Sequence, residues 1–231
     1  MNSKVIVALD NMNLADTMEL VSRLEPGLCR LKVGKELFTR NGPSVVDSLV
    51  NKGFDVFLDL KFHDIPNTVA NACKAAADLG VWMLNVHASG GRKMMVAAQE
   101  ALSGLSKPPL LIAVTILTSL SDEDLAEIGY CANTEEQVKR LAILAAESGM
   151  NGVVCSPLET TMITALGLKD FSLVTPGIRP KDSSVDDQSR IQTPAQAIQN
   201  GSSYLVIGRP ITRSNDPLKA LLSINEQIKN A

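Results

Sequence analysis

The sequence predicts a (β/α)8 barrel (a TIM barrel), a closed parallel sheet surrounded by helices. Short apolar segments alternate with amphipathic segments along the chain, eight times in all. The apolar segments are continuous runs of Val, Ile and Leu, which is typical of parallel strands buried on both faces. Because 231 residues suit one such barrel, we expect a single domain over residues 1–231.

The strands and helices are expected in strict alternation. The apolar runs, expected as strands, cover residues 4–10, 29–34, 56–60, 81–88, 109–117, 152–156, 171–178 and 203–208. The segments with helical spacing of apolar residues cover 13–25, 43–53, 65–80, 90–102, 134–149, 157–167, 193–201 and 216–231. Residues 121–129 are expected as an acidic short turn. The long polar stretch 179–192 is expected as a lid over a site.

A doubly wound open sheet is the main alternative fold. Such a sheet usually carries a glycine-rich nucleotide-binding loop after its first strand. Here that position reads ALDNMNLAD and contains no glycine. No linker or low-complexity tract suggests a second domain, so the barrel is the preferred interpretation.

The composition gives no sign of nucleic-acid or membrane partners. The net charge is −3 and aromatic residues make up 3% of the chain, which offers neither a basic surface nor a stacking platform. No apolar run reaches membrane-spanning length, and the N-terminal residues lack a signal-peptide pattern. Cys29, Cys73, Cys131 and Cys155 lack metal-ligand spacing and are expected as small core residues. A cytoplasmic location is therefore expected.

Three charged residues stand at the end of the third expected strand. Alternation along the strand places Asp59 and Lys61 on one side, and Asp64 follows just before Pro66 opens a helix. A salt-bridged strand end would also explain this pattern. However, charges retained at an apolar strand end cost stability, which favours a functional role.

Polar residues at the ends of the other strands extend this set. In a (β/α)8 barrel the active site lies at the carboxyl ends of the strands, so these residues are expected to converge. They are Asp10, Lys32, Asp59, Lys61, Asp64, His87, Thr118, Arg179 and Arg209. The alternating order of Asp10, Lys32, Asp59 and Lys61 predicts an array of paired charges at one mouth.

The last two strands end in sequences suited to phosphate. TPGIRP follows the seventh strand and IGRPIT closes the eighth. Loops at these positions commonly bind phosphate through backbone N–H groups and glycine. Arg209 beside Gly208 adds a forked cation. These residues therefore predict a phosphate ligand.

The chain resembles the orotidine 5′-monophosphate decarboxylase family. The segments VALD, LKVG, DLKFHDIPNT, VHASGG, VTPGIRP and IGRPIT carry the resemblance in family order. It implies a cofactor-free, metal-free lyase that converts orotidine 5′-monophosphate to uridine 5′-monophosphate in de novo pyrimidine biosynthesis.

The resemblance also implies roles for individual residues. Lys61 is implied as the proton donor, with Asp59, Asp64 and Lys32 as further catalytic residues. The implied substrate-binding residues are Asp10, Lys32, Asp59, Lys61, Asp64, Thr68, Thr118, Arg179, Gln188, Gly208 and Arg209. A homodimer is also implied, in which Asp64 and Thr68 serve the active site of the neighbouring subunit.

Two other functions compete with this one. Sugar-phosphate decarboxylases or aldolases that resemble this barrel share D-x-K-x-x-D but require magnesium. They carry an acidic residue where this chain has Lys32, a cation that disfavours a divalent metal. A non-catalytic nucleotide-sensing barrel would need phosphate ligands but not the charged array.

Overall fold

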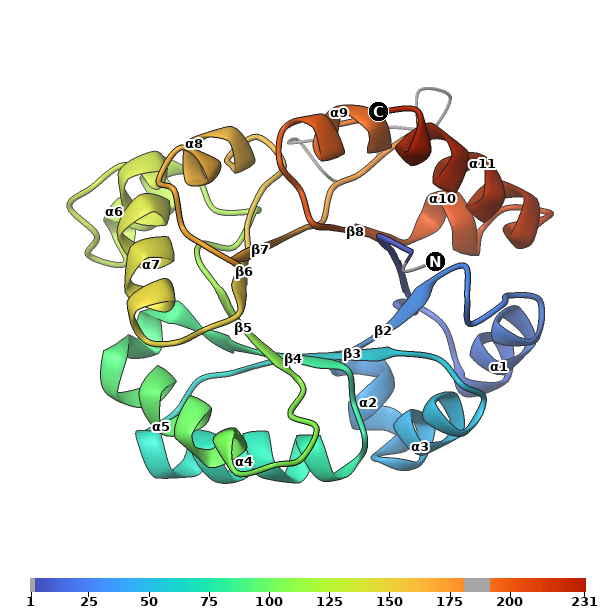
Figure 1. The fold of residues 1–231 in the computed structure, drawn as a ribbon, viewed down its shortest axis with the longest axis horizontal. Helices are drawn as coiled ribbons and strands as arrows, with labels where there is room; N and C mark the ends of the chain where they lie inside the picture. Colours follow the sequence, from blue (N-terminus) through green and yellow to red (C-terminus); the bar gives the residue numbers. More distant parts are fainter. Residues whose placement is uncertain (1–2, 181–191) are drawn as a thin grey trace.

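A computed structural model of the protein, which describes residues 3–180 and 192–231, contains a closed barrel with helices around it (Figure 1). The eight strands follow one another around the barrel in chain order, and β8 closes against β1. Neighbouring strands are parallel throughout. The predicted (β/α)8 fold is confirmed.

The strands are short, as their sequences predict. They are β1 Val5–Ala8, β2 Arg30–Gly34, β3 Val56–Phe62, β4 Met83–His87, β5 Leu110–Val114, β6 Gly152–Val154, β7 Ser172–Thr175 and β8 Tyr204–Ile207. The helices between them are α1 Leu14–Ser22, α2 Lys35–Asn41, α3 Ser44–Asn51, α4 Pro66–Asp78, α5 Gly91–Ser103, α6 Asp122–Glu127, α7 Thr134–Glu147, α8 Thr160–Thr164, α9 Pro194–Gln199, α10 Arg209–Thr212 and α11 Pro217–Lys229, with a 3-10 turn η1 at Ala88–Gly90.

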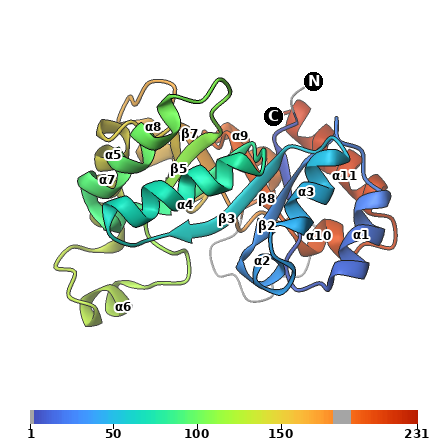
Figure 2. The same ribbon diagram turned by 90° about the horizontal axis from the view of Figure 1, so that it is seen from below.

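The connections after β2, β5 and β8 hold helices that sequence patterns did not predict. After β2 the chain forms α2 before the expected α3, and Gly42 (φ +63°) separates the two. Residues 121–129 form helix α6 rather than a turn, because the Ser121 hydroxyl and the Asp124 carboxylate each accept a hydrogen bond from the other's backbone N–H. Figure 2 shows α6 standing away from the barrel wall. After β8 the four-residue α10 begins at Arg209.

The barrel encloses one apolar cluster and is wrapped by a second. Side chains alternate along each strand, so Ile6 and Ala8 point inward while Val5 and Val7 join the layer between sheet and helices. At the amino-terminal end, Arg30 closes the interior with its guanidinium carbon 4.2 Å from the centre of the Trp82 ring. The interior is therefore packed below the mouth, which leaves the carboxyl ends of the strands for a site.

The cysteines divide into two groups. Cys29, Cys73 and Cys155 are buried, and burial raises the pKa of the Cys29 and Cys73 thiols to about 12. Cys131 is exposed, so its prediction as a core residue was wrong. It lies between α6 and α7, in the connection that follows β5.

Among residues 3–180 and 192–231, no helix combines the length and the apolar character needed to cross a membrane. The same residues include no cluster of three or more His, Cys, Asp or Glu side chains placed to hold a metal ion.

Candidate active site

A cavity of about 600 Å³ opens at the carboxyl ends of the strands. Its floor includes Phe57, Val154 and Val206 from the barrel interior. Eight of the residues that the sequence singled out line it, namely Asp10, Lys32, Asp59, Lys61, Thr118, Arg179, Gly208 and Arg209. The barrel thus brings together polar residues that are far apart in the sequence.

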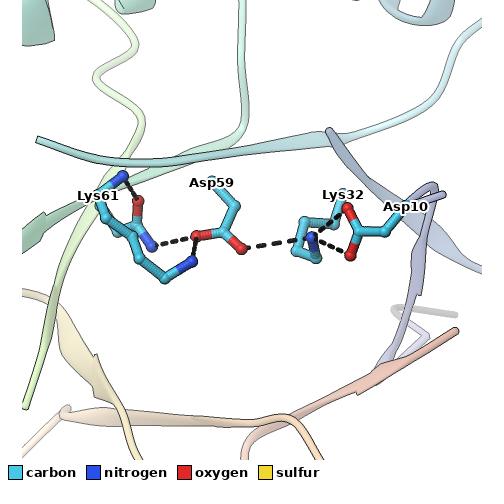
Figure 3. Close-up of polar contacts among 5 residues, drawn as sticks. Asp10, Lys32, Asp59 and Lys61 are labelled. Atoms are coloured by element: carbon cyan, nitrogen blue, oxygen red, sulfur yellow. Dashed lines mark hydrogen bonds and ion pairs between the residues drawn. The ribbon is translucent and has the colours of Figure 1, made fainter. Parts of the chain in front are cut away.

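Four charged side chains form a continuous chain along one wall of this cavity (Figure 3). The Lys61 ammonium donates to Asp59 Oδ1 at 2.5 Å. Asp59 Oδ2 lies 3.3 Å from the Lys32 ammonium, which in turn donates to both oxygens of Asp10 at 2.9 and 2.8 Å. Adjacent strands supply these residues, so the alternation of negative and positive charge follows the order of β1, β2 and β3.

The inner members of the array are the most strongly paired. Burial acts to lower the pKa of the Lys32 ammonium, but attraction to Asp59 and Asp10 outweighs burial and raises that pKa above its ordinary value. Burial acts in the opposite sense on Asp59, and Lys32 and Lys61 together hold the pKa of this carboxyl below its ordinary value. Both groups are therefore charged at neutral pH. Of the two lysines, Lys61 is the more accessible, since its side chain is 24% exposed against 8% for Lys32.

Gly34 leaves the room that this array occupies. A Cβ atom at this position would lie 2.4 Å from Asp10 Oδ1 and 3.2 Å from Lys32 Nζ. Any larger residue would therefore push Asp10 away from Lys32. The glycine that ends LKVG is thus required by the side chains beside it and not by its own backbone angles.

Lys61 reaches the cavity through an irregular backbone. Leu58 pairs with Leu84 and Phe62 with Val86, so the pairing advances four residues along β3 but two along β4. Within this shift Lys61 has a φ of +53°, in the left-handed region that side chains rarely adopt. Its N–H donates to Asn85 Oδ1 at 2.8 Å, and Asn85 Nδ2 donates to Asp59 Oδ1 at 2.7 Å.

Asn85 is the residue that sequence reasoning missed. It is fully buried in the middle of β4. The signal was present, since a single amide in the apolar run VWMLNVHA needs buried partners. Other cavity-lining residues that were not predicted lie in the connections and helices that follow the first and last strands; they include Asn11, Met12, Asp16, Thr212 and Arg213.

Some predicted site residues lie elsewhere. Asp64 and Thr68 are exposed and do not line the cavity of their own chain, and Asp64 Oδ1 accepts from the Ile65 N–H at 2.6 Å. His87 ends β4 outside the cavity lining, and burial together with His63, Lys35 and Lys61 lowers its pKa to about 4. Gln188 and most of the expected lid at 179–192 lie outside the described residues.

The opposite wall of the cavity carries arginines. Arg179 follows β7, whereas Arg209 and Arg213 lie at the two ends of α10, after β8. Arg179 is nearly buried, and its guanidinium donates to the Ile178 carbonyl at 3.0 Å. Glycines 177 and 208 allow close approach of a ligand to the backbone beside them. This wall is suited to an anion such as phosphate.

The comparisons with known proteins agree with this geometry. A family model described as orotidine 5′-phosphate decarboxylase / HUMPS family matches residues 3–224. The orotidine 5′-phosphate decarboxylase of Hahella chejuensis is 60% identical over 227 residues, covering 98% of this chain and 97% of the relative. That of Chromobacterium violaceum is 61% identical, covering 98% of this chain and 92% of the relative.

A solved structure gives the same result in three dimensions. The crystal structure of orotidine 5′-phosphate decarboxylase from Lactobacillus acidophilus superimposes with a TM-score of 0.87 at 43% sequence identity. The superposition covers 99% of this chain and 100% of the Lactobacillus acidophilus chain. With a family match over nearly all of its length, the chain belongs to the orotidine 5′-phosphate decarboxylase / HUMPS family.

Proposed function

We propose that this protein decarboxylates orotidine 5′-monophosphate to uridine 5′-monophosphate and carbon dioxide, in de novo pyrimidine biosynthesis and without a metal or organic cofactor. The observation that carries the proposal is the array of Asp10, Lys32, Asp59 and Lys61 on one wall of a cavity. Membership of the family supports it.

The proposed reaction needs a cation that can also donate a proton. When the carboxylate leaves the pyrimidine ring as carbon dioxide, the electron pair of the broken bond remains on the ring carbon. The Lys61 ammonium stabilises that charge and then transfers one proton to the carbon, which leaves a neutral amine. A Schiff-base role fits less well, because a lysine must be neutral to attack, whereas the Lys61 ammonium is ion-paired with Asp59.

The other residues of the cavity have proposed binding roles. Asp10 and Lys32 contact the ribose side of the nucleotide, and Thr118 lies near the pyrimidine. Arg179, Gly208 and Arg209 hold the phosphate, and we propose that Gln188, which lies outside the described residues, joins them. Binding energy from the phosphate, which does not react, can serve the reacting end of the substrate.

Assay of purified protein tests this function directly. Orotidine 5′-monophosphate is incubated with the protein, and loss of the substrate is followed with and without a chelator. Turnover that is unaffected by the chelator and by added magnesium is expected, because the ammonium of Lys32 occupies the position where a divalent metal would need an acidic ligand. Chelator-sensitive turnover of a sugar phosphate, restored by magnesium, would favour the alternative relatives.

The phosphate assignment predicts a selective defect in Arg209→Ala. Loss of a charged hydrogen-bonding partner should reduce kcat/KM for the phosphorylated substrate by about 30-fold or more. This corresponds to a loss of transition-state stabilisation of roughly 2 kcal/mol. The phosphate-free nucleoside should be affected much less. Arg140→Ala, which removes an exposed arginine on α7, is the matched control. An equal loss for both substrates would contradict the assignment.

We further propose that the protein is a cytoplasmic homodimer in which Asp64 and Thr68 complete the site of the neighbouring subunit. Both residues are exposed and stand outside the cavity of their own chain. Between them Ile65 is 67% exposed, an apolar side chain that a partner surface could cover.

Mixing two inactive variants tests the shared site. Lys61→Ala and Asp64→Ala chains are exchanged at equal concentration, and decarboxylation is measured. In a mixed dimer one site carries both substitutions and the other carries neither. With random exchange and independent sites, roughly a quarter of wild-type activity should return. If the chains exchange and activity stays at the average of the two variants, Asp64 acts within its own subunit.

A further inference from the structure

The backbone of Lys61 needs an external support. A left-handed φ is unfavourable for a residue with a side chain, and among the described non-glycine residues it occurs at Asn11, Lys61 and Asp170. The register shift between β3 and β4 also removes the Lys61 N–H from the regular ladder. The chain therefore places a charged residue of the array on an unfavourable backbone, which other groups must hold.

Asn85 supplies that support and fixes Asp59 at the same time. Its Oδ1 accepts from the Lys61 N–H at 2.8 Å, and its Nδ2 donates to Asp59 Oδ1 at 2.7 Å. The orientation of the amide is determined, because a backbone N–H only donates and a carboxylate only accepts. One buried side chain thus ties the main chain of Lys61 to the carboxylate that pairs with its ammonium.

The contact also determines which oxygen of Asp59 faces which lysine. Oδ1 receives both Asn85 Nδ2 and the Lys61 ammonium, whereas Oδ2 faces Lys32. Rotation of this carboxylate would break the bond to Asn85. Asn85 itself does not line the cavity, so it is not placed to touch a substrate.

We propose that Asn85 is a positioning residue for the reaction: it holds Lys61 in the left-handed conformation and fixes Asp59, so that the Lys61 ammonium points into the cavity. This inference rests on the proposed function for its effect on turnover. Its geometric part concerns the conformation of residue 61 and does not depend on the substrate.

Asn85→Leu separates positioning from packing. Leucine has the same branched shape and fills the space, but it makes neither hydrogen bond. A packing role therefore predicts nearly normal turnover. A positioning role predicts a fall in kcat of roughly 100-fold, the size expected when a reacting group is misplaced by about 1 Å. The affinity for uridine 5′-monophosphate should stay close to that of the wild type, because the phosphate wall is unchanged.

Asn151→Leu is the matched control. The Asn151 side chain also accepts a backbone N–H across the sheet, from Leu111 at 2.8 Å, but it lies at the amino-terminal end of the strands. Its replacement should leave kcat unchanged.

If Asn85→Leu does not fold, Asn85→Asp serves instead, because it keeps the acceptor for the Lys61 N–H while it places a second carboxylate against Asp59. Its kcat should fall in the same way.

A crystal structure of the folded variant completes the test. We expect residue 61 to leave the left-handed region or Asp59 to rotate. A folded Asn85→Leu protein with wild-type kcat, or with residues 59 and 61 unmoved, would overturn the proposal. If the wild type itself does not decarboxylate orotidine 5′-monophosphate, the proposed function fails, and the crystal structure still decides whether Asn85 positions Lys61.

Discussion

Lys61→Ala is expected to abolish almost all decarboxylation while the protein still binds uridine 5′-monophosphate. The ammonium is proposed both to stabilise the carbanion and to protonate it. Loss of a general acid alone typically costs 10²- to 10⁴-fold, and loss of an electrostatic partner costs a similar factor, so kcat should fall by roughly 10⁴-fold or more. Single-turnover kinetics and equilibrium binding of the nucleotide measure the two effects separately.

Lys139→Ala provides the control for the loss of a lysine. Its ammonium lies on α7, on the outside of the barrel, where it pairs with Glu135 at 3.3 Å. This variant should keep wild-type turnover. Substantial decarboxylation by folded Lys61→Ala protein would remove Lys61 from the role of proton donor.

Asp59→Asn is expected to lower the free energy of unfolding by roughly 3 kcal/mol at pH 7, the size found when one partner of a buried ion pair is removed. Lys32 would lose one of its two carboxylates while remaining buried, and Lys61 would lose the carboxylate at 2.5 Å. The pKa of Asp59 is lower in the folded protein than in the unfolded chain, so its ionised form stabilises the fold above the unfolded value of about 3.9. That contribution is lost as the pH falls through the folded-state pKa of Asp59. The difference in the free energy of unfolding between Asp59→Asn and the wild type should therefore become smaller at low pH. Urea unfolding at several pH values measures this difference.

Two further variants test the electrostatic origin of this effect. Asp55→Asn breaks the ion pair with Arg30 at 3.2 Å, but Asp55 is 54% exposed, so the loss should be at most about 1 kcal/mol. Adding Lys61→Met to Asp59→Asn restores charge balance in the array, so the double variant should be more stable than the sum of the single changes by roughly 1 kcal/mol. Strict additivity would show that the stability effect comes from lost packing.

The sequence predicted the barrel because its strands are buried on both faces and read as unbroken apolar runs. It also predicted which polar residues lie at the ends of those strands, and seven of these nine line one cavity. The geometry of β3 was beyond this reasoning. Simple alternation places Asp59 and Lys61 on one side, but the chain reaches this arrangement through a register shift and a left-handed residue.

Other features depended on interactions that periodicity does not encode. The support from Asn85 is a contact between two strands, visible in the sequence only as one amide in an apolar run. Helix α6 is stabilised by the reciprocal caps of Ser121 and Asp124, in a short acidic segment where Leu125 is the one fully buried apolar side chain. The exposure of Cys131 follows from where the excursion around α6 leaves the barrel, which local sequence does not specify.

The closure of β8 against β1 fixes the distance between strands on opposite sides of the barrel. Lys61 lies on β3 and Arg179 lies in the segment after β7, and these two strands are opposite each other in a ring of eight. The span between the proposed reacting group, Lys61, and Arg179 is thus the width of the barrel mouth, which the number of strands and the packed core determine. If the proposed roles hold, this width is expected to favour a nucleoside monophosphate, because a diphosphate would extend past Arg179 or push its base beyond the Lys61 ammonium.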